Sequence, residues 1–236
     1  MKFASLLDRI RNVPRYIKNR VNYLTGSTVL IHIGKCGGST VVRELERSDL
    51  SFYQVHIRPA RYVKGKEYFI ALRNPVSRFI SAFNWRYKLV VLDQVQKDRF
   101  DGEYDLLKKF GDVNRLAEAL YNNNGDLLID LSNKDNYIHH LYEDIQFYLK
   151  DFLNDCPAEN IGGVICTESL AEDMKRLFNI DVTRHDKKNK SMSTQLSPLA
   201  KENLNRYLKP EFDIIDKLND MGVLTGEQYS ILTFRA

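Results

Sequence analysis

The chain has 236 residues, the size of one ordinary domain, because a single hydrophobic core rarely grows beyond about 250–300 residues. Its composition of 43% hydrophobic and 28% charged residues, with 12 Gly and 6 Pro, excludes disordered, collagen-like and coiled-coil proteins. The formal net charge of +4 is too small to indicate a nucleic-acid partner. We therefore expect one globular domain with a sizeable core.

The cysteine pattern and the hydropathy point to a reducing compartment. Cys36, Cys156 and Cys166 form no CxxC pair, which predicts neither a disulfide framework nor a structural zinc site. No run of about 18 apolar residues could span a membrane, and the first residues lack the apolar stretch of a secretory signal. We expect a cytoplasmic protein without a bound metal.

Basic residues concentrate in the first third of the chain. Residues 1–24 carry six basic side chains and one acidic one, with apolar residues at helical spacing around Pro14, which predicts a basic amphipathic helix. This helix either packs its apolar stripe on the domain or makes a peripheral contact with an anionic membrane surface. Residues 25–90 have a net charge of +7 and residues 91–160 one of −8. We expect an anion site early in a single domain that spans residues 25–236.

Short β-branched runs alternate with helical patterns along that domain. The runs predict buried strands at 28–33, 51–56, 68–72 and 161–167. Helical spacing predicts helices from 39 onward, at 76–89, at 136–153, between 167 and 178, at 197–207 and at 210–221. The alternation predicts an α/β fold, a P-loop-like three-layer α/β/α arrangement around a central parallel sheet. We expect residues 91–150 to form an acidic helical insertion over the site.

The first strand pattern ends in the motif HIGKCGGST, residues 32–40. The adjacent glycines let backbone N–H groups approach an anion, the start of the next helix adds partial positive charge, and Lys35 adds a cation. Ser39 and Thr40 add hydroxyl donors. The motif is not GxxxxGK[ST], the Walker A loop of ATP-binding proteins, because its lysine precedes the glycine pair.

The third strand pattern ends in a second motif, FIALRNPVSRFISAF, residues 69–83. Arg73 at the end of the strand can bind a phosphate through two hydrogen bonds. Ser81, eight residues later on the predicted helix, can add a hydroxyl to the same anion. The chain therefore carries two separate anion-binding signals.

Together the two motifs resemble the cofactor loops of the sulfotransferases that use 3′-phosphoadenosine 5′-phosphosulfate (PAPS), most closely the carbohydrate sulfotransferases. In that family the first loop commonly reads HxPKxGGT[ST] and the second RDPVxRxxSxY. The likeness covers the two loops closely and the strand and helix framework loosely. Residues 91–160 match no part of the family pattern.

The resemblance implies that the chain transfers the sulfuryl group of PAPS to a hydroxyl of a glycan, without a metal. It implies that Lys35 stabilises the leaving phosphate and that Arg73 and Ser81 bind the 3′-phosphate. The residues implied to surround the 5′-phosphosulfate are Lys35, Cys36, Gly37, Gly38, Ser39 and Thr40.

Several positions depart from the family pattern. Gly34 replaces the usual Pro, Cys36 the usual Thr or Ser, and Asn74 the usual Asp. Cys36 is either an acidic thiol beside Lys35 or a small side chain in a crowded turn. Glu168 is similar to an acidic position of the family, and we interpret it as a helix-start residue.

His56 is the expected base for the acceptor hydroxyl, with a polar strand-end residue as the alternative. It ends the second strand pattern, and the carboxyl ends of strands in open α/β sheets face the ligand. The resemblance adds that a histidine in this interval acts as the base in similar carbohydrate enzymes. His32, on the first strand, is expected to be structural.

Other candidate contacts have simple structural alternatives. The candidates for the acceptor are His139, His140 and Trp85, and those for closing over the 3′-phosphate are Lys188, Lys190 and Ser191. Adjacent helical residues point about 100° apart, so at most one of the two histidines is expected to face the site. The alternatives are an exposed or core-satisfied histidine pair, an aromatic core stripe and a solvated charged loop at 184–191.

The acidic insertion bears on the acceptor, because it is the expected acceptor wall. Its charge favours a neutral or lightly charged glycan over a strongly sulfated one, with a tyrosine or small-alcohol hydroxyl left open. Two other functions remain open. One is a P-loop kinase-like phosphotransferase, which predicts a magnesium requirement, and the other is a non-catalytic module that binds a phosphorylated nucleotide or another anion.

Overall fold

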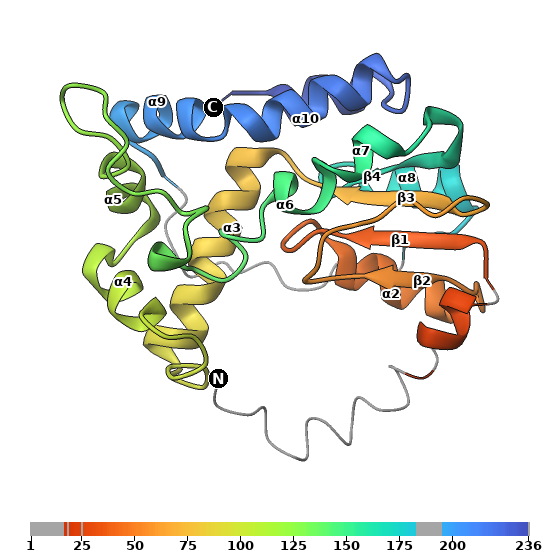
Figure 1. Cartoon of the computed structure of the whole chain (residues 1–236), viewed down its shortest axis with the longest axis horizontal. Coiled ribbons are helices and arrows are strands. Elements are labelled where there is room, and N and C mark those ends of the chain that lie inside the picture. Colours follow the sequence, from red (N-terminus) through yellow and green to blue (C-terminus); the bar gives the residue numbers. More distant parts are fainter. Residues whose placement is uncertain (1–16, 18, 25, 183–194, 236) are drawn as a thin grey trace.

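Four parallel strands form the central sheet (Figure 1). The computed structural model describes residues 17, 19–24, 26–182 and 195–235. In spatial order the strands are β2 (Tyr53–Val55), β1 (Thr28–His32), β3 (Glu67–Leu72) and β4 (Ile161–Cys166). Each neighbouring pair is parallel. The predicted α/β class and the predicted parallel sheet are therefore confirmed.

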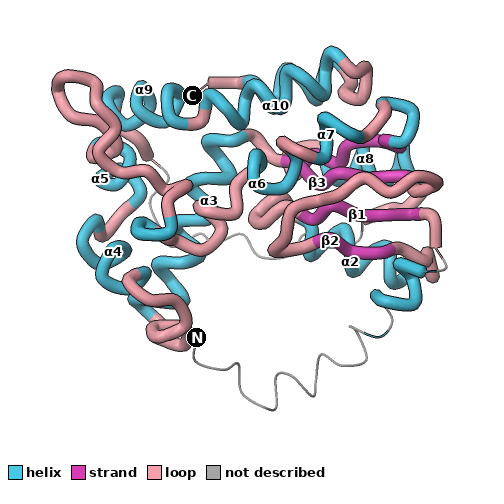
Figure 2. The backbone as a smooth tube through the Cα atoms, viewed as in Figure 1, coloured by secondary structure: helices cyan, strands magenta, loops and turns pink. Residues whose placement is uncertain are grey.

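Apolar side chains fill both faces of this sheet, as the continuous apolar runs predict. Leu30 of β1 packs on one face, whereas its neighbours Val29 and Ile31 belong to the larger core on the other. The first face lies under α2 (Gly38–Arg47) and α8 (Leu170–Phe178), and the second packs against α3 (Pro75–Tyr87) and α10 (Lys209–Asp220). This arrangement is compatible with three layers, and Figure 2 shows helices on both sides of the strands.

Short helices make up the segment between α3 and β4. They are η1 (Lys88–Leu92), α4 (Glu103–Phe110), α5 (Val113–Glu118), η2 (Lys134–Asn136), α6 (Ile145–Leu149), α7 (Phe152–Asp155) and η3 (Ala158–Asn160). Helices α4 and α5 lie on the side of α3 away from the sheet (Figure 1). The chain then returns past α3 toward the strands before α6 begins.

The predicted helix at 136–153 is wrong. His140 has a φ of 69°, a left-handed conformation that ends any right-handed helix. The backbone N–H groups of His139 and His140 donate to the carboxylates of Glu103 and Glu143, and not to helical carbonyls. A new helix begins at Ile145. Contacts with a residue 36 positions away therefore override the local helical spacing.

The segment before β1 covers the edge of the sheet. Residues 19–24 are helical, and the Asn19 side chain bonds both the N–H and the C=O of Gln54 in β2. These bonds take the place of a further strand on an edge that would otherwise present unpaired groups. Val21 and Leu24 are exposed, whereas the Tyr23 ring lies 4.8 Å from the Tyr53 ring of β2. No helix among the described residues is long and apolar enough to cross a membrane.

Three helices complete the described chain: α9 (Pro198–Tyr207), α10 and α11 (Gly226–Thr233). The first two were predicted and are confirmed. The third begins with a capping box in which Thr225 and Gln228 bond each other's backbone N–H groups. Its end reaches Asn74, which is the first residue after the Arg73 position and the N-cap of α3.

Asn74 joins α3 to the end of α11 through both ends of its amide. Its Oδ1 accepts from the N–H of Ser77, and its Nδ2 donates to the carbonyls of Ile231, Leu232 and Phe234 at 3.3, 3.2 and 2.8 Å. An aspartate can do the first but not the second. The structure thus gives a physical reason for asparagine at this position.

The substitution Asn74→Asp should lower the free energy of unfolding by about 2–3 kcal/mol, because a buried carboxylate would face three carbonyl oxygens. Urea unfolding of the variant and the wild type measures this difference. The matched control is Asp112→Asn at the N-cap of α5, where the side chain accepts from the N–H of Arg115 and asparagine caps equally well. Equal stability of Asn74→Asp and wild type would contradict this account.

Candidate active site

The two anion motifs meet at one edge of the sheet. Strands β1 and β3 are parallel neighbours with His32 opposite Ala71, so the loop after His32 and Arg73 leave the sheet side by side. His56 follows β2 on the other side of β1, and Glu168 follows β4 on the other side of β3. The carboxyl ends of all four strands therefore carry polar or charged groups at a place where open α/β sheets bind ligands.

The first loop is a tight turn that begins α2. Lys35 and Gly37 have φ values of 69° and 68°, and Gly37 is the N-cap of the helix. Gly38 is closely packed: a β-carbon there would lie 1.9 Å from the His32 ring, so a larger residue would displace that histidine. Ser39 is exposed on the first turn and Thr40 is buried. The first N–H groups of a ten-residue helix thus point out of this edge.

The side chains of Lys35 and Cys36 have different surroundings: one contacts an aromatic ring and the other lies in the core. Lys35 Nζ lies 4.4 Å from the ring centroid of Trp85 on α3, a cation–π contact that fixes its direction. Trp85 is half-buried, and its ring contacts the Lys35 ammonium group. The Cys36 side chain lies in the large core, and burial raises the pKa of its thiol to about 12. The thiol is therefore protonated at neutral pH and is a small core side chain.

His56 stands beside the loop with its ring orientation fixed. Its Nδ1 lies 2.8 Å from the backbone oxygen of His32, and the two imidazole rings stack at 4.1 Å. A carbonyl oxygen can only accept, so Nδ1 carries the proton in the neutral ring and Nε2 carries the lone pair. The His32 ring is held in turn by Gln54, whose Nε2 lies 2.6 Å from His32 Nδ1. This pattern gives His56 the tautomer that a general base requires.

Arg73 lies next to a partner that the sequence did not identify. Arg73 Nε is 3.8 Å from Glu168 Oε1 and has no hydrogen-bond partner among the described residues. Glu168 accepts from the backbone N–H of Asn74, and burial raises its pKa although Arg73 acts to lower it. Helix α8 begins after it, at Leu170. The signal for this pair was its position, since Arg73 directly follows β3 and Glu168 lies two residues after the end of β4.

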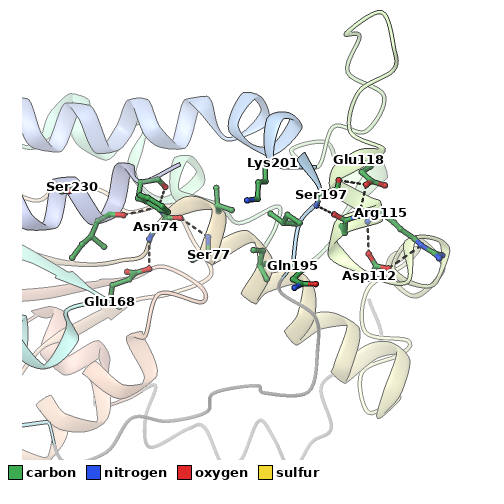
Figure 3. Close-up of a pocket in the computed structure, with 16 residues that line it drawn as sticks. Asn74, Ser77, Asp112, Arg115, Glu118, Glu168, Gln195, Ser197, Lys201 and Ser230 are labelled. Carbon is green, nitrogen blue, oxygen red and sulfur yellow. Dashed lines mark hydrogen bonds and ion pairs between the residues drawn. The ribbon is translucent and has the colours of Figure 1, made fainter. Parts of the chain in front are cut away.

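A cavity of about 1360 Å³ opens beside Asn74, between the start of α3 and the helices α5 and α9 (Figure 3). Its polar wall includes Asn74, Ser77, Glu118, Glu168, Ser197 and Lys201. Ser81 lies one helical turn beyond Ser77 on α3, half-buried and outside the cavity lining. The cavity thus continues the edge of the sheet on the Arg73 side.

His139 and His140 lie together in a buried turn, not on a helix. His139 Nδ1 is 3.0 Å from Glu143 Oε2, and the rings of His139 and His140 are 4.0 Å apart. Ligand atoms of His139, His140 and Glu143 all lie within 4.8 Å of one another, so the turn is a possible metal site that the sequence did not predict.

The three residues predicted to close over the 3′-phosphate, Lys188, Lys190 and Ser191, lie outside the described residues.

A buried carboxyl group after this turn has an unusual proton affinity. Burial and the charge of Glu211 raise the pKa of Asp144 to about 7, although Arg78 acts to lower it. A raised carboxyl pKa means that the folded protein keeps a proton that the unfolded chain loses. The free energy of unfolding therefore falls as the pH rises from about 4 to about 7.

The variant Asp144→Asn should lack this fall and exceed the wild type in stability at pH 8 by about 1–2 kcal/mol. Asn retains the cap of α6, where the side chain accepts from the N–H of Phe147. Urea unfolding at pH 5 and pH 8 measures the difference, which should be small at pH 5. A wild type that stays the more stable protein at pH 8 would contradict the assigned proton.

Comparisons of the chain with protein-family models, with curated proteins and with solved structures gave no match.

Proposed function

We propose that the chain is a P-loop-like sulfotransferase that moves the sulfuryl group of PAPS to a hydroxyl of a carbohydrate acceptor. One observation carries the proposal: two loops suited to anions leave the adjacent parallel strands β1 and β3, and His56 directly follows β2 on the other side of β1. The order of the loops is that of the PAPS-binding motifs, in which the 5′-phosphosulfate and the 3′-phosphate are bound separately.

The roles follow from charge and position. The turn at Gly37 and Gly38, with Lys35, binds the 5′-phosphosulfate at the start of α2. Arg73 and Ser81 bind the 3′-phosphate; the Arg73 Nε without a hydrogen-bond partner supports this role, because buried donors are rarely left unpaired. The adjoining cavity provides room for the adenosine part of the nucleotide.

The transfer needs little besides positioning and charge. The bond from sulfur to the 5′-phosphate oxygen breaks while a bond from sulfur to the acceptor oxygen forms, in line with it. Lys35 stabilises the charge that develops on the leaving oxygen. His56 takes the acceptor proton on Nε2, because its Nδ1–H is bonded to His32. Neither step requires a redox reaction.

The acidic insertion supports a neutral glycan as the acceptor. Residues 91–160 carry a net charge of −8, and their turn at His139 and His140 lies against the first loop. An acidic wall repels a strongly sulfated polymer. The acceptor class is therefore a neutral or lightly charged oligosaccharide.

Thermal unfolding with adenosine 3′,5′-bisphosphate tests the nucleotide. A ligand at a hundredfold excess over its Kd adds about 2.7 kcal/mol to the free energy of unfolding, which raises Tm by several degrees. We expect this shift with the bisphosphate, a much smaller one with AMP, and its loss in Arg73→Ala. A larger shift with ATP and magnesium would favour a kinase-like phosphotransferase. Equal shifts with any phosphate, together with full function of His56→Ala, would favour a non-catalytic anion-binding module.

A further inference from the structure

His140 is brought from the insertion to the first anion loop. A β-carbon on Gly34 would lie 2.5 Å from His140 Nδ1, so the ring packs directly on this glycine. The His140 ring is also 6.3 Å from the ring of His56. The sequence feature that permits this contact is Gly34, at a position where the similar family has proline.

Buried charged groups hold the turn that carries this ring. Arg78 Nη1 donates to the carbonyl of His140 at 2.7 Å, and the N–H of His140 donates to Glu143 at 2.7 Å. The N–H of His139 donates to Glu103 at 2.9 Å. These bonds keep His140 at its positive φ, which costs a β-branched or ring-bearing residue free energy unless its surroundings determine it.

The ring nitrogen that faces the loop has no hydrogen-bond partner among the described residues. His140 is about 9% exposed, and its Nδ1 makes no hydrogen bond within the described part of the chain. Leaving a buried polar atom unpaired costs about 1–3 kcal/mol, so native proteins seldom do so without a ligand to pair it. The unpaired atom points to the turn where the phosphosulfate would bind.

The surroundings favour an anionic ligand over a metal ion. Burial, followed by the charges of His139, Lys35 and His56, lowers the pKa of His140 well below 6.5, so its ring is neutral at neutral pH. Nearby positive charge that depresses this pKa also opposes a divalent cation. Glu143 already accepts from Tyr137, His139 and the N–H of His140. A neutral imidazole still has one N–H to donate.

We propose that His140 donates a hydrogen bond from its ring to an oxygen of the transferring sulfuryl group, opposite His56. This inference rests on the proposed function. His140 gains and loses no proton; the acceptor proton goes to His56, and sulfur exchanges the 5′-phosphate oxygen for the acceptor oxygen. The residue is thus a third catalytic group, supplied by the insertion, beside Lys35 and His56.

The test needs no acceptor, because His140 should distinguish PAPS from the desulfated nucleotide. Calorimetry gives the Kd of PAPS and of adenosine 3′,5′-bisphosphate, and release of labelled sulfate gives the rate of transfer to water. In His140→Leu the affinity for PAPS should fall about tenfold relative to the bisphosphate, and the rate about 10²-fold. His140→Gln retains an N–H donor and should recover part of both.

Two further variants make the result decisive. Gly34→Ala should move the ring away and produce the same selective loss of PAPS affinity. Tyr142→Phe is the matched control, because the ring of this residue contacts the rings of Tyr137 and Phe147 in the same segment and should behave as wild type. An unchanged ratio of the two affinities in His140→Leu overturns the inference alone. A wild type that binds neither nucleotide overturns the proposed function as well.

Discussion

Replacing His56 with alanine should slow sulfuryl transfer by about 10²–10⁴-fold while leaving the affinity for adenosine 3′,5′-bisphosphate unchanged. The loss follows from the fixed tautomer: Nδ1–H is bonded to the carbonyl of His32, so the lone pair on Nε2 accepts the acceptor proton. Binding should persist because the anion loops and Arg73 are intact. Initial rates with labelled PAPS and a mixture of neutral oligosaccharides measure the first effect, and calorimetry the second.

The matched control for this result is Gln54→Leu. Gln54 bonds the His32 ring, on which His56 stacks, so its loss should disturb the base without removing it. We expect a decrease well below that of His56→Ala. If His56→Ala transfers sulfate at the wild-type rate, the base lies elsewhere; if it also loses the bisphosphate, the residue is structural.

Replacing Arg78 with methionine should lower the free energy of unfolding by about 3–5 kcal/mol, the second large effect. Arg78 is fully buried and donates to both carboxylate oxygens of Glu211 at 3.1 Å. Without it, Glu211 and Asp144 are two buried carboxyl groups without the Arg78 charge, and the pKa of Asp144, which Arg78 acts to lower, rises further. Raised carboxyl pKa values mean stability that is lost as the pH rises, so the deficit should be larger at pH 8 than at pH 5.

Urea unfolding at both pH values measures this deficit, and a second substitution separates its cause. The double variant Arg78→Met with Glu211→Leu removes both charges and should recover most of the loss, because an apolar pair can replace a buried ion pair at little cost. A deficit that is the same at both pH values, or that the double variant does not reduce, would mean that packing and not charge determines it.

Local patterns carried enough information to predict the sheet and its loops. The strands are short runs buried on both faces, so composition alone marks them, and Arg73 and His56 follow directly from the strand ends. The turn at His139 and His140 could not be predicted in this way. Its backbone is held by Glu103 and Arg78, which lie 36 and 62 positions earlier in the chain.

The same limit explains the residues that were missed or misplaced. Glu168 does precede a helix, as interpreted, but its partner Arg73 follows another strand, and only the order of the strands makes the two neighbours. The sequence left open whether the Cys36 side chain faces solvent or the core. In the structure it lies in the larger hydrophobic core. Helix α11 is short, and its capping box is visible in the sequence only as Thr225 and Gln228 at a spacing of three.

The bonds from Asn74 to the end of α11 have a consequence for synthesis on the ribosome. Strands β1 to β3 are made early, but the carbonyls that hold the Asn74 side chain come 157 to 160 residues later. The loop that carries Arg73 cannot reach its final form until Phe234 has left the exit tunnel. Nascent chains released before that point should contain the sheet but lack the bonds that hold the Asn74 side chain.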